Sequence, residues 1–197
     1  MNQIKITIFT PGNVPDSYTF GENYIKEIKF SKQLMDTSFD INPSIIEQYA
    51  EIVLKDKGGV ISNLIVSGVL NKGLVLRVYI DDVFIQSYLT ASWDIQAQDT
   101  TIKLYCDDLV KKLENKQTMP VEPNNFSLYQ LFAKAFEWAG MSYVYESSSI
   151  SDIAQQIILY DTYVPYTDLL TFIKKLCVTG FFRIYWDKTH FVIARCY

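Results

Sequence analysis

Residues 74–95 have the sequence LVLRVYIDDVFIQSYLTASWDI, in which two apolar segments flank a pair of acidic residues. Leu74–Ile80 and Val83–Thr90 are rich in aliphatic, β-branched and aromatic residues, which favour strands. Asp81 and Asp82 between them indicate a tight turn. This stretch therefore predicts two successive strands of a β-rich domain.

The sequence on either side of this stretch has the same character. Ile4, Ile6 and Ile8 alternate with polar residues, which is the period-two pattern of a half-buried strand. Further strands are predicted at residues 24–30, 51–55, 64–70 and 100–106, and the short turn at 71–73 predicts a hairpin between 64–70 and 74–80. A short helix is predicted at Asp107–Asn115. Six or seven short strands with tight turns indicate a small barrel or a sandwich.

The second half of the chain has a mixed pattern. Residues 116–125 contain two prolines and no apolar period, which predicts a linker. Ser127 can cap a helix whose apolar residues follow the 3.6 period up to Gly140, and Thr167 can cap a second helix that ends near Gly180. A polar turn is predicted at 146–149, and short strands are predicted at 142–145, 156–161, 181–186 and 190–195, the last two forming a hairpin.

These patterns predict an α+β fold class, with a β-rich N-terminal small barrel or sandwich followed by a smaller α+β module. The expected domains are a β-barrel-like domain at residues 1–115 and an α+β module with a terminal hairpin at 126–197, joined by the linker at 116–125.

Composition excludes several classes of protein. The net charge of −4 disfavours nucleic-acid recognition, which needs a basic surface. No segment approaches the ~20 apolar residues that span a bilayer, and the first residues lack the pattern of a signal peptide, so we expect synthesis in the cytoplasm and no membrane span. Cys106, Cys177 and Cys196 are widely spaced and odd in number, which predicts buried thiols rather than a disulfide framework or a metal site.

No motif supports catalysis. His190 is the only histidine and has no metal-ligand partner at a suitable spacing, and glycine-rich phosphate loops are absent. The pairs Asp81–Asp82 and Asp107–Asp108 are adjacent residues, which predicts structural roles in a turn and at a helix start. A carboxylate pair from different elements, such as Asp94 with Asp108, stays open. We therefore expect no catalytic, cofactor-binding or metal-binding residue and no cofactor.

Aromatic residues make up 15% of the chain, with 14 tyrosines and 12 phenylalanines. Trp93, Trp138 and Trp186 could stack on sugar rings if they were exposed. The predicted strand content favours core and interface positions for them instead.

The order of these elements resembles that of the phage tail hub proteins, the central subunits of a baseplate or tail tip. In the first half the resemblance rests on EIVLKDKGGVIS (51–62), GVLNKGLVLRVYI (68–80), DDVFIQSYLTASWDI (81–95) and TIKLYCDDLVKKLEN (101–115). In the second half it rests on NFSLYQLFAKAFEWAGMSYVY (125–145) and QQIILYDTYVPYTDLLTFIKKLCVTGFFRIYWDKTHFVIA (155–194).

The resemblance implies a non-enzymatic structural subunit that assembles into a ring, with a trimer favoured. Its implied partners are tail tube, spike or other baseplate proteins, and its implied location is a virion tail or phage-like particle. Hub proteins of this kind continue into a complete second barrel, whereas this sequence contains one hairpin of it. Ring assembly would also cover exposed strand edges.

Two alternatives stay open from the sequence. One is a carbohydrate- or cell-surface-binding module of a tail or secreted assembly, with Trp93 or Trp186 at its surface. The other is the non-catalytic part of a tail-associated cell-wall hydrolase.

Overall fold

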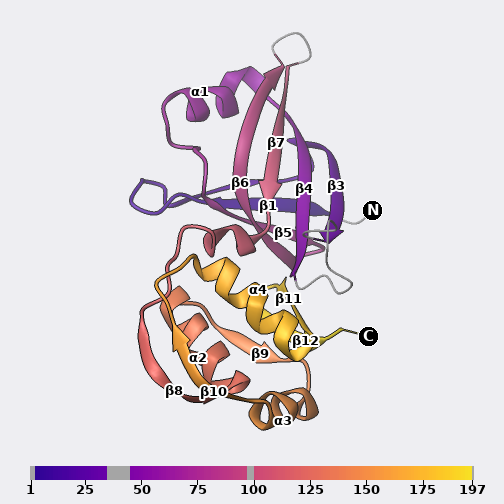
Figure 1. Ribbon diagram of the computed structural model, residues 1–197. Coiled ribbons are helices and arrows are strands. Elements are labelled where there is room, and N and C mark those ends of the chain that lie inside the picture. Colours follow the sequence, from indigo (N-terminus) through magenta and orange to yellow (C-terminus); the bar gives the residue numbers. More distant parts are fainter. Residues whose placement is uncertain (1–2, 35–44, 97–99, 197) are drawn as a thin grey trace. The chain divides into compact units, whose positions relative to one another are not determined.

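The computed structural model describes residues 3–34, 45–96 and 100–196. The chain forms two compact units (Figure 1): an N-terminal unit of residues 1–32 and 48–109, and a C-terminal unit of residues 33–47 and 110–197. Strands dominate the first unit and both helices and strands build the second, which confirms the predicted α+β class. The division into domains at 1–115 and 126–197 stays a prediction.

The N-terminal unit is a curved sheet of strands in the order β2-β1-β5-β6-β7-β4-β3. In Figure 1, β1 and β5 run across the direction of β4, β6 and β7. Neighbouring strands are antiparallel from β2 to β4. The strands are β1 (Ile4–Phe9), β2 (Ser17–Phe20), β3 (Ile25–Leu34), β4 (Ile45–Lys55), β5 (Val75–Ile80), β6 (Val83–Gln96) and β7 (Thr101–Asp107).

One hydrophobic core fills the inside of this sheet. It takes alternate residues from the strands, as the period-two pattern predicts. Full burial of such a side chain stabilises the fold by about 1.5–3 kcal/mol. The strand residues of this core are Ile6, Ile8, Phe20, Ala50, Ile52, Leu54, Leu76, Val78, Tyr88, Ile102, Leu104 and Cys106, with Ile25 and Ile28 of β3 packed against them.

The strand predicted at 64–70 is wrong, because this segment begins in a helix. A 3₁₀ turn, η1 (Lys57–Gly59), leads into α1 (Val60–Val66). The Asp56 carboxylate accepts hydrogen bonds from the N–H of Ile61 at 2.9 Å and from the hydroxyl of Ser62, which stabilises the start of the helix. Ile61, Leu64 and Ile65 pack on the core at helical spacing.

As a consequence, the predicted hairpin between 64–70 and 74–80 does not form. The strand β5 pairs instead with β1 and β6. The helix predicted at Asp107–Asn115 is also shorter than expected. Strand β7 continues through Asp107, and a single 3₁₀ segment, η2 (Leu109–Lys112), follows it.

The C-terminal unit combines three helices with two groups of strands. The hairpin β11–β12 is flanked by β9, which is parallel to β12, and by Ile45 and Ile46 of β4, which are parallel to β11. Strands β8 and β10 pair with each other in a separate two-stranded ribbon. The elements are β8 (Val121–Ser127), α2 (Leu128–Ala139), β9 (Tyr143–Tyr145), α3 (Ser148–Gln156), β10 (Ile158–Val164), α4 (Leu169–Gly180), β11 (Phe182–Asp187) and β12 (His190–Arg195).

The caps of the two longer helices explain where they begin. Ser127 caps α2 as predicted, within a capping box that it forms with Gln130. The helix ends at Gly140, whose φ of 64° lies in the left-handed region that glycine tolerates. The cap predicted for α4 at Thr167 is wrong by one residue, because Asp168 accepts the hydrogen bond from the N–H of Thr171 at 2.8 Å. Among the described residues, every helix is too short or too polar to span a bilayer.

Two segments have more regular structure than their composition predicts. Residues 121–125, predicted as part of a linker, form the first part of β8. The polar segment 146–149, predicted as a turn, leads into α3, which buries Ile150 and Ala154 on one side. In both cases a partner element supplies the hydrogen bonds or the apolar surface that the local sequence does not indicate.

Replacing Ser127 by alanine should destabilise the protein. The substitution removes the acceptor for the N–H of Gln130, and losing such a cap costs about 1 kcal/mol. Urea unfolding measures the change in free energy. The control is Ser148→Ala, at an exposed serine in the first turn of α3, which should change stability little. Equal effects of both substitutions would contradict the role of the capping box.

The three thiols should react with thiol reagents at different rates. Burial raises the pKa of all three thiols, but Cys106 and Cys177 are buried in the interior whereas Cys196 is only partly buried and can be reached by a reagent. Alkylation of the native protein followed by peptide mass spectrometry should modify Cys196 first. All three should react alike in denaturant. Rapid labelling of Cys106 in the native protein would show that its side chain is accessible.

Candidate assembly surface

In the part of the chain that the structure describes, the candidate catalytic residues do not lie together. Asp94 lies opposite Lys103 in the β6–β7 ladder, and Asp108 follows Lys103 by five residues, which separates the two aspartates by about 16 Å along the strand direction. Carboxylate pairs of glycoside hydrolases lie within about 9.5 Å. His190 contacts the hydroxyl of its neighbour Thr189 at 3.3 Å. Within the described ranges there is no group of three or more metal-ligating side chains.

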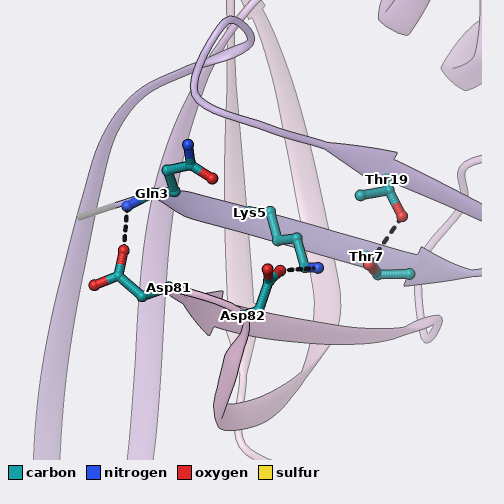
Figure 2. A network of polar contacts seen from close by, with 6 residues as sticks. All are labelled: Gln3, Lys5, Thr7, Thr19, Asp81 and Asp82. Atoms are coloured by element: carbon teal, nitrogen blue, oxygen red, sulfur yellow. Dashed lines mark hydrogen bonds and ion pairs between the residues drawn. The ribbon is translucent and has the colours of Figure 1, made fainter. Parts of the chain in front are cut away.

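The pair Asp81–Asp82 has the structural role in a turn that the sequence predicts. Its φ angles of 50° and 61° are those of a type I′ hairpin turn between β5 and β6. Figure 2 shows Asp81 accepting a hydrogen bond from the backbone N–H of Gln3 and Asp82 paired with Lys5 on β1. Thr7 and Thr19 join β1 to β2 on the same strand surface through their hydroxyls, 3.0 Å apart. The acids therefore tie the turn to β1.

Asp108 is the buried member of the second acidic pair. It is 1% exposed and accepts a hydrogen bond from the backbone N–H of Gln48 at 2.8 Å. Burial raises the pKa of the adjacent Cys106 thiol, and the negative charge of Asp107 raises it further. Because the thiol stays protonated near neutral pH, these residues support the fold around β4 and β7 rather than a nucleophile.

The tryptophans are parts of packed clusters. Trp186 is 7% exposed, contacts Phe191 edge to face and donates to the carbonyl of Lys188 at 3.0 Å. Trp93 is partly buried against the core of the N-terminal unit, and Trp138 packs against Phe172. The prediction that core positions outweigh sugar-stacking positions for these residues agrees with their places.

Three exposed tyrosines lie on the β8–β10 ribbon and just after it. Tyr160, Tyr163 and Tyr166 are 75%, 54% and 69% exposed. Ile158 of β10 and Met119, just before β8, are exposed as well. Tyrosine is enriched in protein interfaces because its ring gives apolar contact and its hydroxyl stays hydrated. We call Tyr160, Tyr163 and Tyr166 the tyrosine cluster.

A bulge explains how two of these tyrosines lie on one exposed strand segment. Leu159 pairs with Phe126 and Thr162 with Asn124, so β10 has one extra residue between these positions. Asp161 takes up the bulge with a φ of 47°, and its N–H is satisfied by the Asn125 side chain at 3.0 Å. The polar side chains of the ribbon hold this irregular geometry in place.

The end of α4 exposes a further aromatic ring. Phe181 is 60% exposed and has a φ of 54°, in the left-handed region that usually holds glycine after a helix. Its carbonyl accepts from the N–H of Cys196 at 3.0 Å, which fixes this conformation. Val178 on the same helix is 50% exposed. Phe181 therefore has a strained backbone without the stabilisation that burial of its ring would give.

The N-terminal unit has an open strand edge at β3. Within the described residues β3 pairs with β4 alone, and Figure 1 shows it on the outer side of β4. Lys26, Lys29 and Lys32 are exposed along it, and Phe30 is 49% exposed while its ring stacks on Tyr88. Such an edge offers unpaired backbone groups, and lysines on it oppose unselective pairing.

The sequence predictions named none of these surface residues as a site. The signal was present in the segment 158–166, where three tyrosines recur at a spacing of three. That spacing does not match the period of a regular strand, and the bulge at Asp161 supplies the extra residue.

Several solved structures of tail proteins have a fold similar to that of this chain. The 43 kDa tail protein of prophage MuSo2 from Shewanella oneidensis matches 99% of this chain and 56% of its own chain, with a TM-score of 0.60 and 12% identity. A tail protein from Neisseria meningitidis MC58 matches 96% of this chain and 50% of its own, with a TM-score of 0.59 and 9% identity. Prophage tail protein gp18 from Listeria monocytogenes EGD-e matches 98% of this chain and 50% of its own chain, with a TM-score of 0.61 and 12% identity.

This chain thus spans about half the length of the tail proteins that it matches. At this level of identity the similarity is one of fold. No family model matches the sequence, and no curated protein matches it.

Replacing Phe181 by glycine should give a more stable protein than replacing it by alanine. Both substitutions remove the exposed ring, but only glycine relieves the left-handed strain, which costs other residues about 1–2 kcal/mol. Thermal and urea unfolding of the two variants measure the difference, expected at about 1 kcal/mol in favour of glycine. An alanine variant as stable as the glycine variant would show that the position is unstrained.

Proposed function

We propose that this chain is a structural subunit of a phage-tail-like baseplate or tail-tip hub, in which it forms a ring that connects the tail tube to the spike. The observation that supports this most is the fold shared over nearly the whole chain with three tail proteins. Because one fold can serve several functions, the proposal also needs surfaces suited to assembly.

Such surfaces are present in both units. The open edge of β3 and the tyrosine cluster expose groups that a partner can bury. Ring assembly covers edges that would otherwise invite unselective aggregation, and it uses tyrosine side chains at the contacts. On this proposal a trimer is the favoured ring, its partners are tail tube, spike and other baseplate proteins, and its location is the virion tail.

The proposed role is not enzymatic. The carboxylates of Asp81 and Asp108 accept hydrogen bonds from backbone N–H groups, and those of Asp82 and Glu51 pair with lysines, so these four acids have structural partners. A carbohydrate-binding module that used Trp93 or Trp186 would need these rings at the surface, whereas both pack against hydrophobic side chains.

A ring-forming subunit should show a discrete mass in solution. Multi-angle light scattering across a range of concentrations should give a trimer, or a hexamer if two rings stack. The mass should stay constant over a wide range of concentration, because a closed ring has no free contacts left. A chain that stays monomeric at its highest soluble concentration would contradict ring formation by this chain alone.

A further inference from the structure

We propose that copies of this chain assemble head to tail, with the β8–β10 ribbon and tyrosine cluster of one copy bound at the β3 edge of the next. The inference rests on the proposed ring and names the two surfaces that would form it. Its basis is the complementary charge and side-chain chemistry of two exposed surfaces within one chain.

The β3 edge is basic. Strand β3 has three lysines and one glutamate, a net charge of +2. Lys29 is 62% exposed and pairs with Glu27 at 3.3 Å, whereas Lys26 and Lys32 are exposed and form no ion pair with the other described residues. Charges at the rim of a contact steer association and set its register.

A hollow of about 410 Å³ lies beside this edge, on the outer side of the sheet. Lys29 and Ser31 of β3 line it together with Tyr49 and Glu51 of β4 and with Tyr105 and Asp107 of β7. Tyr105 is 39% exposed there. The hollow itself is therefore not basic: it offers aromatic walls for a tyrosine ring and carboxylates that can accept a hydrogen bond from its hydroxyl, and the positive charge lies on the lysines of β3.

The ribbon has the opposite charge. Strands β8 and β10 contain Glu122 and Asp161 and no lysine or arginine, a net charge of −2. Both acids are exposed, and the tyrosine cluster projects from the same ribbon and the residues after it. A two-stranded ribbon exposed in this way gains stability when a partner covers it.

Lysine and tyrosine also form favourable contacts with each other, because an ammonium group is attracted to the face of an aromatic ring. The chain already contains two such contacts in the N-terminal unit. Lys5 lies 5.2 Å from the ring centre of Tyr79, and Lys57 lies 5.7 Å from that of Tyr24. Lysines of β3 and tyrosines of the ribbon would repeat this contact between copies.

Charge argues against each surface pairing with itself. A ribbon-to-ribbon contact would bring together two copies of Glu122 and Asp161, and a contact between two β3 edges would bring together two sets of three lysines. Like charges in an interface oppose association. A contact between unlike surfaces is heterologous, and repeated heterologous contacts close into a ring when the rotation between copies allows it.

Two variants test this pairing. The edge variant carries Lys26→Glu, Lys29→Glu and Lys32→Glu, and the ribbon variant carries Tyr160→Ser, Tyr163→Ser and Tyr166→Ser. The matched controls change other exposed residues: Lys55→Glu, Lys72→Glu and Lys175→Glu for charge, and Val66→Ser with Val83→Ser for apolar surface. Circular dichroism and thermal unfolding verify that every variant is folded.

Light scattering should show the oligomer for the wild type and both controls, and the mass of a single chain for each variant alone. A 1:1 mixture of the two variants should form a dimer and nothing larger. The edge variant keeps its ribbon and the ribbon variant keeps its β3 edge, so one contact can form and no chain can extend.

Three results would overturn the pairing. An oligomer that persists in both variants would show that other surfaces hold it, and the proposed ring would stand. An edge variant that dimerises alone would show ribbon-to-ribbon contact. A wild-type chain that stays monomeric at every concentration would contradict the ring and the pairing together.

Discussion

The fold depends on one shared core, to which every strand of the N-terminal unit contributes side chains. Ile6 and Ile8 of β1, Leu76 and Val78 of β5, and Leu104 of β7 are fully buried in it. Because successive side chains of a strand point to opposite faces, a slip of one residue would expose such a pair to solvent. The core therefore sets the register of the sheet, and with it the positions of the β3 edge and the Asp81–Asp82 turn.

This constraint explains which elements could be predicted from the sequence. The alternation of β1 and β5 and the helical period of α2 are local patterns, and the structure confirms them. Helix α1 was missed because its valines and isoleucines favour strands, while the hydrogen bonds that start it come from Asp56. Strand β8 was missed because a segment with Pro123 and two asparagines forms a strand only by pairing with β10. The exposed surfaces were harder still to predict from the sequence, since nothing in a local pattern distinguishes a buried tyrosine from an exposed one.

Several features of the C-terminal unit do little for its own stability. Phe181 is strained and exposed, and the bulge at Asp161 interrupts the β8–β10 ladder while two tyrosines of β10 stay in solvent. In a chain selected only for folding, a glycine at position 181 and a regular ladder would be more stable. Features of this kind persist where a function requires them. Contact with another chain is a requirement that would account for all of them, because burial at an interface would offset the exposed apolar area.

Among tail proteins of similar fold, the core determines the fold and the surface determines the function. They share the fold with this chain at 9–12% identity. A core tolerates many apolar sequences that keep its volume and its alternation, so such similarity preserves the sheet and leaves the surface free to change. Partner choice then depends on the surface: on which edge carries lysines, which strand bulges and which loop exposes an aromatic ring. In this chain the basic edge and the acidic tyrosine ribbon belong to different units, so the proposed contact between two copies would require neither unit to change its core.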